Sequence, residues 1–125
     1  MDKIELKDNF VLSQNVLNSL HWSKRHKLKK EWMKAVMVAM YEPKPRIRKA
    51  KIGEKFKLSY LHIREKHRII HDHDNLVGGS KLLQDALRDM NFIFDDDIEF
   101  IGKPIHTQIA GETNSIIITR TPQVL

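Results

Sequence analysis

The stretch His71-Asp72-His73-Asp74-Asn75, followed after two residues by Gly78-Gly79-Ser80-Lys81, lies near the middle of this 125-residue sequence and decides how the rest is interpreted. On an extended segment, side chains two residues apart point to the same side, so the carboxylates of Asp72 and Asp74 would lie together. Two such charges repel each other unless a hard cation such as Mg²⁺ binds between them. The stretch therefore predicts an extended segment with a divalent-cation site. A turn is the alternative, since Asp and Asn favour turns.

Apolar periodicity on both sides of this stretch predicts one sheet and two helices. Alternating or β-branched apolar residues indicate extended segments at residues 3–7, 54–64, 69–70, 98–105 and 115–119. Helical spacing predicts a helix from Ser23, its N-cap, to Tyr41, where Pro43 and Pro45 end it. A second helix follows the interruption at Gly78-Gly79 and carries its apolar face on residues 82–90. Residues 11–20 are expected to be irregular.

This order of elements predicts a single α+β (α/β) domain over residues 1–125, with a mixed β-sheet and two main helices packed on it. Trp32 falls in the apolar register of the first helix and is expected in the core, whereas Trp22 could stack on bases. His71 and His73 flank the aspartates and could be metal ligands, but the alternation of a strand favours the face opposite the aspartates.

Charge is distributed unevenly along the chain, which has a formal net charge of +6. Eleven of the 22 Lys and Arg lie between His21 and Lys51, and eight of the 16 Asp and Glu lie between Asp72 and Glu99. A basic stretch suggests a polyanionic partner, most commonly nucleic acid. A divalent cation would reconcile the acidic patch with a phosphate ligand. The alternative is that both are solvated faces.

The composition excludes several classes of protein. The sequence has no cysteine, which excludes a disulfide scaffold, a thiol nucleophile and cysteine-ligated metal sites. The longest apolar run, residues 35–41, is far shorter than the ~20 residues of a membrane-spanning helix. The N-terminus has no apolar segment of the secretory type. We therefore expect a cytoplasmic protein that has no membrane partner.

A longer motif carries a family resemblance. Asp-His-Asp-Asn at residues 72–75, Lys81, Asp-Ala-Leu at residues 85–87 and the aspartates at residues 95–97 resemble the RusA-type crossover-junction endodeoxyribonucleases. The Gly-Gly-Ser-Lys at residues 78–81 is similar to a sequence that many members carry. Asn91 stands where a glycine is typical, and asparagine can also adopt a positive φ at a helix C-terminus. Residues 11–40 resemble the family more weakly.

The resemblance implies a Mg²⁺-dependent homodimer that resolves four-way (Holliday) DNA junctions by paired symmetric nicks during recombination or repair. Mn²⁺ could substitute for Mg²⁺. By position, the implied metal ligands are Asp72, Asp74 and Asp96, and Lys81 is the implied essential lysine. In the triple aspartate, Asp95 or Asp97 could replace Asp96. The side chains expected to contact DNA phosphates are Lys24, Arg25, Lys27, Lys29, Lys30, Arg46, Arg48 and Lys49.

A second hypothesis is a nucleic-acid-binding module of the same fold, such as one of phage origin, that is non-catalytic or has another substrate. The non-catalytic module predicts salt-dependent DNA binding without Mg²⁺-dependent cleavage. The sequence cannot separate junctions from other branched substrates, because a metal site of this kind recognises a phosphate and not a topology.

Overall fold

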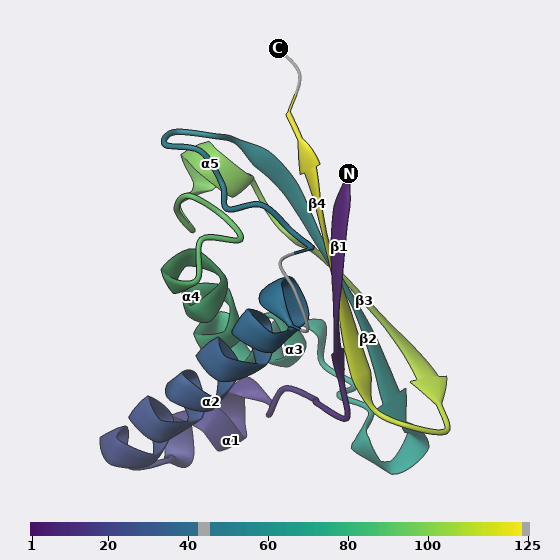
Figure 1. Ribbon diagram of the computed structural model, residues 1–125. Helices are drawn as coiled ribbons and strands as arrows, with labels where there is room; N and C mark the ends of the chain where they lie inside the picture. The colour runs from purple at the N-terminus through teal and green to yellow at the C-terminus, as the bar shows by residue number, and fades with distance from the viewer. Residues whose placement is uncertain (43–45, 124–125) are drawn as a thin grey trace.

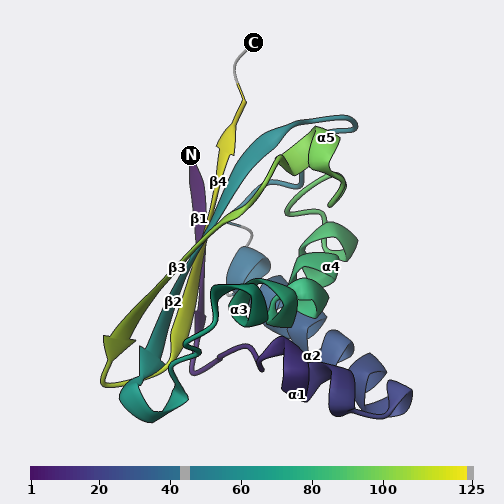
Figure 2. The same cartoon turned by 180° about the vertical axis from the view of Figure 1, so that it is seen from behind.

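The computed structural model describes residues 1–42 and 46–123, which form a mixed four-stranded sheet with helices on one of its faces (Figures 1 and 2). The elements, in chain order, are β1 (Asp2–Lys7), α1 (Gln14–Ser19), α2 (Trp22–Tyr41), β2 (Phe56–Glu65), η1 (Lys66–Arg68), α3 (His73–Gly79), α4 (Lys81–Asp89), α5 (Ile98–Ile101), β3 (Ile105–Gly111) and β4 (Ser115–Pro122). The predicted α+β domain with two main helices, α2 and α4, is confirmed.

The strand order of the sheet is β1-β4-β2-β3. β4 is antiparallel to both β1 and β2, whereas β3 is parallel to β2. Parallel neighbours need a crossover connection, and here the chain between β2 and β3 contains α3, α4 and α5. The crossover brings the segment with the acidic residues onto the helical face of the sheet.

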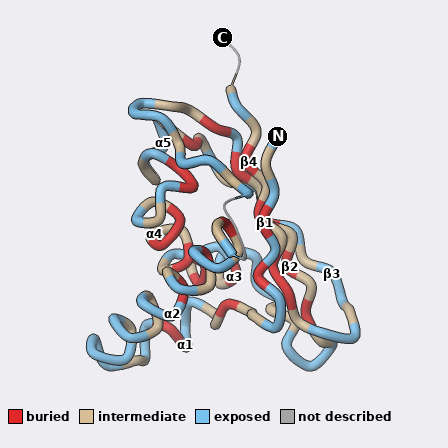
Figure 3. Tube along the Cα trace, viewed as in Figure 1, coloured by how far each residue is buried: buried red, intermediate tan, exposed pale blue. Residues whose placement is uncertain are grey.

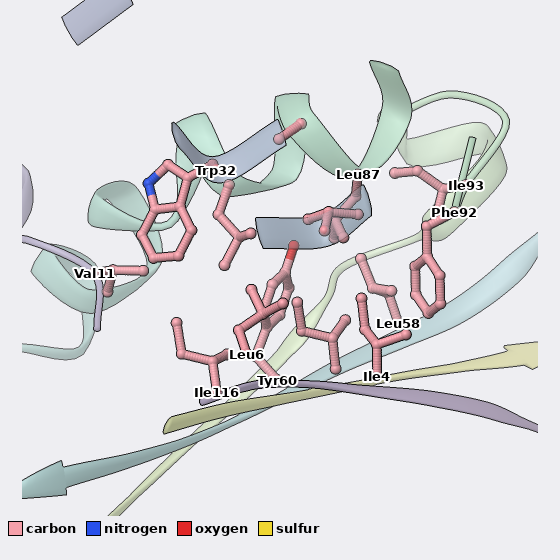
Figure 4. Close-up of a cluster of buried hydrophobic side chains, with 14 of the residues drawn as sticks. Ile4, Leu6, Val11, Trp32, Leu58, Tyr60, Leu87, Phe92, Ile93 and Ile116 are labelled. Atoms are coloured by element: carbon pink, nitrogen blue, oxygen red, sulfur yellow. The ribbon is translucent and has the colours of Figure 1, made fainter. Parts of the chain in front are cut away.

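The core lies between the sheet and the two main helices, α2 and α4 (Figure 4). β2 alternates buried and more exposed residues along its length, and its buried side chains include Phe56, Leu58 and Tyr60. Trp32 of α2 is 5% exposed, which confirms the prediction that it belongs to the core. Leu87 of α4 is fully buried in the same cluster.

Three short helices were not expected from the sequence. α1 lies within residues 11–20, α3 replaces part of the expected extended stretch, and α5 occupies the first part of the expected strand 98–105. Each begins at a side chain that accepts a hydrogen bond from a backbone N–H of the first turn: Ser13, Asp72 and Asp97. These local caps favour helix over the extended structure that apolar alternation suggested.

Two further predictions need correction. α2 begins at Trp22 and not at Ser23, because the ring of His21 accepts the hydrogen bond from the Ser23 backbone N–H. Ile70 is not in a strand, since its backbone N–H and C=O are both bonded by the side-chain amide of Gln108. Pro43 and Pro45, which were expected to end the first helix, lie outside the described residues.

Gly78 and Gly79 do not interrupt the chain but form the last turn of α3. At Gly79 an added Cβ would lie 1.9 Å from the carbonyl oxygen of Leu12, so a glycine lets α3 approach the segment before α1. Asn91 adopts φ +62° after α4, as expected for this position. Among the helices of residues 1–42 and 46–123, none has the length and apolar character needed to cross a bilayer.

Candidate functional site

The acidic pair at the start of α3 is arranged differently from the sequence prediction. Asp72 is the N-cap of α3, and its Oδ1 accepts hydrogen bonds from the backbone N–H groups of Asp74 at 2.9 Å and Asn75 at 3.3 Å. Asp74 lies in the first helical turn, where residues two apart do not face each other. The expectation that both carboxylates share one side of an extended segment is therefore wrong, and both side chains are exposed. The prediction that His71 and His73 lie on the opposite strand face is wrong for the same reason, since His73 is the first residue of α3.

A cluster of four charged side chains connects α4 with the loop before α5. Lys81, the first residue of α4, places its Nζ 3.6 Å from Oδ2 of Asp96 and 3.8 Å from Oδ1 of Asp85. The Arg88 guanidinium donates to Oδ1 of Asp96 at 3.1 Å. We call these residues the Lys81 cluster. The structure thus brings together two of the predicted site residues, Lys81 and Asp96, and adds Asp85 and Arg88.

The three consecutive aspartates have three different roles. Asp96 is the member that joins the Lys81 cluster, where its side chain is 13% exposed. Asp95 accepts a hydrogen bond from the Asp96 backbone N–H at 2.7 Å, and so supports that loop. Asp97 caps α5 by accepting from the backbone N–H of Glu99 at 2.9 Å. Of the three, the geometry favours Asp96 as the functional carboxylate.

The pKa values of the two carboxyl groups in the Lys81 cluster are shifted in opposite directions. Burial, helped by the neighbouring carboxyl of Asp96, raises the pKa of Asp85 despite the nearby Lys81 and Arg88. Burial also opposes ionisation of Asp96, but its hydrogen bond with Asp85 and the positive charges of Arg88 and Lys81 lower the pKa of Asp96. The pair thus places a carboxylate beside a carboxyl group that retains its proton more readily, an arrangement typical of acid–base sites.

Aromatic and imidazole rings lie beneath the cluster. The Tyr60 hydroxyl donates to Oε1 of Gln84 at 3.2 Å, and burial together with the charges of Asp85 and Asp96 raises the pKa of Tyr60. The ring of His106 stacks on Tyr60 with centroids 4.3 Å apart, and its Nδ1 lies 3.0 Å from Nε2 of His62. Burial lowers the pKa of His62 to about 3 and that of His106 to about 4, so both rings are neutral at pH 7.

The sequence held a signal for part of this site. Asp85 and Arg88 follow Lys81 by four and seven residues, which places all three on one helical face. His106 gave no such signal, because it reaches Tyr60 only through the parallel register of β3 on β2, in which the two residues are partners.

The donor set suits a hard cation only in part. Asp85 and Asp96 offer the carboxylate oxygens that Mg²⁺ prefers, but Lys81 and Arg88 already balance them. Within residues 1–42 and 46–123, no three His, Asp or Glu side chains form a group that could hold a metal ion. Metal binding by Asp72, Asp74 and Asp96 therefore stays a prediction.

The predicted DNA-contacting residues fall into two groups. Lys29 forms an ion pair with Asp89 at 3.0 Å, and Arg48 binds Glu54 through two hydrogen bonds of 2.8 and 2.6 Å. These two positive charges therefore have intramolecular partners. The exposed members of the remaining six are Lys24, Lys27, Lys30, Arg46 and Lys49. The Lys29–Asp89 pair links α2 to α4, so the basic helix lies directly beside the helix of the Lys81 cluster.

Comparison with known proteins does not assign this chain to a family. No protein-family model matches the chain, and no curated protein matches it. The features that point to a function are therefore the motif of residues 72–97 and the geometry of the Lys81 cluster.

Proposed function

We propose that this protein is a Mg²⁺-dependent, structure-selective endodeoxyribonuclease that resolves four-way DNA junctions, as its resemblance to the RusA-type enzymes suggests. The observation that supports the proposal is the 3.6 Å approach of Lys81 to Asp96. The resemblance named these two residues from separate parts of the motif, and the fold places them in one charged cluster. A partly buried ammonium–carboxylate pair beside a basic helix is suited to phosphodiester chemistry.

If the acidic residues of the motif bind Mg²⁺, the ion would polarise a phosphoryl oxygen of the substrate and lower the pKa of a bound water. Lys81 is 63% exposed at its side chain, so its ammonium can turn from Asp96 to a non-bridging phosphate oxygen. Asp85, with its raised pKa, is the group best suited to hold a proton for the leaving 3′-oxygen. The resemblance implies products with a 5′-phosphate and a 3′-hydroxyl.

Binding would come mainly from the basic first half of the chain. Lys24, Lys27 and Lys30 are exposed on α2 and would contact phosphates, which provides affinity with little sequence selectivity. A four-way junction has near two-fold symmetry and needs two nicks, so we propose that a two-fold homodimer acts on it.

The direct test uses a labelled four-way junction and a matched linear duplex, each with Mg²⁺, Mn²⁺ or EDTA. We expect paired symmetric nicks in the junction alone, and none in EDTA. Asp72→Ser is the informative variant, because serine also caps helices while it removes the carboxylate. Asp72→Ser and Asp74→Asn should lose cleavage and keep junction binding. Wild-type cleavage by both variants would contradict the proposal.

A second comparison tests the choice among the three aspartates. Asp96→Asn should abolish cleavage, whereas Asp97→Asn should remain active, because asparagine can also cap α5. Both proteins keep the same loop length and lose one negative charge. If Asp97→Asn were inactive and Asp96→Asn active, the functional carboxylate would be Asp97.

One observation favours the non-catalytic alternative. In the described residues, Asp72 and Asp74 form no metal-holding group of three with another acidic or histidine side chain. A binding module would show salt-dependent junction binding but no cleavage with either metal.

A further inference from the structure

β1 forms one edge of the sheet, and in the part of the chain that the structure describes only β4 pairs with it. The register continues at Asp8, whose backbone N–H donates to the carbonyl oxygen of Asn114 at 2.9 Å. Backbone groups alternate in direction along an antiparallel strand, so every second residue before Asp8 also faces β4. The N–H and C=O groups of the residues between them, Lys3, Glu5 and Lys7, therefore point away from the sheet.

Lys3 and Glu5 hold the open positions of this edge. The Lys7 carbonyl already accepts a hydrogen bond from the Asn9 side-chain amide at 2.7 Å. Among the described residues, the outward backbone groups of Lys3 and Glu5 have no such partner. Buried and exposed residues alternate along β1 (Figure 3), with Ile4 buried and the side chains of Lys3 and Glu5 exposed on the open face of the sheet. The edge therefore presents two residues with unpaired backbone groups and opposite charges.

The charges of β1 favour one antiparallel pairing of two copies. In a continuous sheet, cross-strand partners lie on the same face, so a two-fold axis must pass through a residue and not between two residues. An axis at Ile4 places Lys3 opposite Glu5 of the second copy, and Glu5 opposite Lys3 of the second copy. These are also the residues whose backbone groups point outward, so they would form hydrogen-bonded pairs.

The other registers of β1 are unfavourable. An axis at Lys3 or at Glu5 would bring like charges together. An axis at Leu6 would use the Lys7 carbonyl, which is already bonded. Charged residues usually protect an edge strand from pairing. Here the alternation of sign on one face replaces repulsion by attraction, but only in the register centred on Ile4.

Grooves beside β1 leave room for a second copy. One groove, of about 460 Å³, lies between β1 and Ile47, and another, of about 500 Å³, lies between β1 and α2. Ala35, Val38 and Ala39 of α2 line the second groove, and Val38 is 39% exposed. Apolar surface therefore adjoins the open edge, and a copy paired with β1 would cover it.

We propose that two copies of this chain associate through β1, antiparallel about a two-fold axis at Ile4, to form one continuous sheet. The contacts are backbone hydrogen bonds between Lys3 and Glu5 of opposite copies and ion pairs between the same two side chains. This axis is perpendicular to the sheet, so the helical layers of both copies lie on the same face. Both Lys81 clusters and both basic α2 helices would then face one side, as contact with a single junction requires. The inference rests on the proposed function only for that use, since association itself requires neither Mg²⁺ nor DNA.

Charge exchange tests the pairing, with the dissociation constant of the dimer measured by sedimentation velocity in EDTA. Lys3→Glu and Glu5→Lys each place like charges across the axis at two positions. Each should raise the dissociation constant about tenfold, since two attractive pairs become repulsive. An equimolar mixture of the two variants has opposite charges at both positions and should form a mixed dimer. The double variant should associate like wild type, and Lys57→Glu, an exposed charge reversal on β2, should change nothing.

A backbone variant tests the hydrogen bonds separately. Glu5→Pro removes an N–H that points away from β4, so β1 should keep its place in the sheet while the second copy loses a donor. We expect a folded monomer, with the circular dichroism spectrum of wild type. If Glu5→Pro does not fold, the charge variants still decide the question.

Two results would overturn the inference: a wild-type chain that stays monomeric, or a dimer that both single charge variants leave intact. In the second case, dissociation of the dimer by Ile109→Lys would locate the interface at β3, the opposite edge, where Ile109 is 45% exposed. No measurement uses Mg²⁺ or DNA, so failure of the nuclease proposal would leave the result intact. A dimer that obeys the charge exchange but cuts no junction would refute the nuclease alone.

Discussion

The ammonium group of Lys81 lies 3.6 Å from a carboxylate oxygen of Asp96 and 3.8 Å from one of Asp85. One positive charge thus faces two carboxyl groups, and Arg88 binds the other oxygen of Asp96. Asp96 therefore has two cationic partners, whereas Asp85 has Lys81 alone in ion-pair contact. Burial and the hydrogen bond with Asp96 raise the pKa of Asp85, whereas hydrogen bonds with Asp85 and Asp95, followed by the charges of Arg88 and Lys81, lower the pKa of Asp96.

Asp85→Asn should stabilise the protein at neutral pH. A raised pKa in the folded state means that Asp85 favours folding below its unfolded pKa, and that this contribution is lost as the pH rises through the folded value. Asparagine removes the cost of the buried charge, so the free energy of unfolding should rise at pH 7. Urea denaturation at pH 7 and pH 4 measures the gain, which should shrink at pH 4. A loss of stability at pH 7 would contradict this account.

The buried histidine pair should make the protein acid-sensitive well above the pKa values of carboxyl groups. Burial lowers the pKa of His62 to about 3 and that of His106 to about 4, so both contribute stability above pH 6.5 that is lost as the pH falls. Between pH 7.5 and pH 5 the expected loss is about 2 kcal/mol for each histidine. Denaturant titrations should show a smaller loss in His106→Gln. The exposed His67→Gln is the control, and a pH profile of His106→Gln that matched wild type would contradict the prediction.

Gly78 and Gly79 are adjacent and should respond differently to alanine. A Cβ on Gly79 would meet the backbone oxygen of Leu12 at 1.9 Å, which cannot move without displacing the segment before α1. A Cβ on Gly78 would meet the side chain of Gln14, which is exposed and free to turn. Gly79→Ala should therefore lower the free energy of unfolding by roughly 3 kcal/mol. Gly78→Ala should change it by less than about 1 kcal/mol. Equal thermal melts of the two variants would disprove the close approach.

The buried side chain of Arg120 should be essential for the stability of the fold. Its side chain is fully buried in the sheet, donates to the carbonyl oxygens of Phe92 and Arg48, and pairs with Asp2 at 3.0 Å. Arg120→Met leaves these acceptors without a donor and should cost about 3–5 kcal/mol, measured by urea unfolding.

The matched control for this variant is Arg46→Met, whose side chain is exposed, and which should stay within about 0.5 kcal/mol of wild type. Similar stability of the two variants would mean that the buried guanidinium contributes nothing net to the fold.

Sequence periodicity determined the elements that bury a regular face. Alternation predicted β1 and β2, a β-branched apolar run predicted β4, and helical spacing predicted α2 and α4. The apolar register of α2 assigned Trp32 to the core. These features follow from the sequence because burial of a strand or helix face repeats every two or 3.6 residues. Asn91 was likewise predictable, since few residue types tolerate its positive φ.

Only the tertiary structure decided which of the predicted site residues come into contact. It selected Asp96 from three aspartates and brought that carboxylate to Lys81 and Arg88 of α4. The order of strands and the crossover through α4 control these contacts, and neither leaves a local periodicity in the sequence. The sequence by itself therefore determined the layers of this protein and the residues worth testing, and the packing of α4 against the loop before α5 decided the cluster.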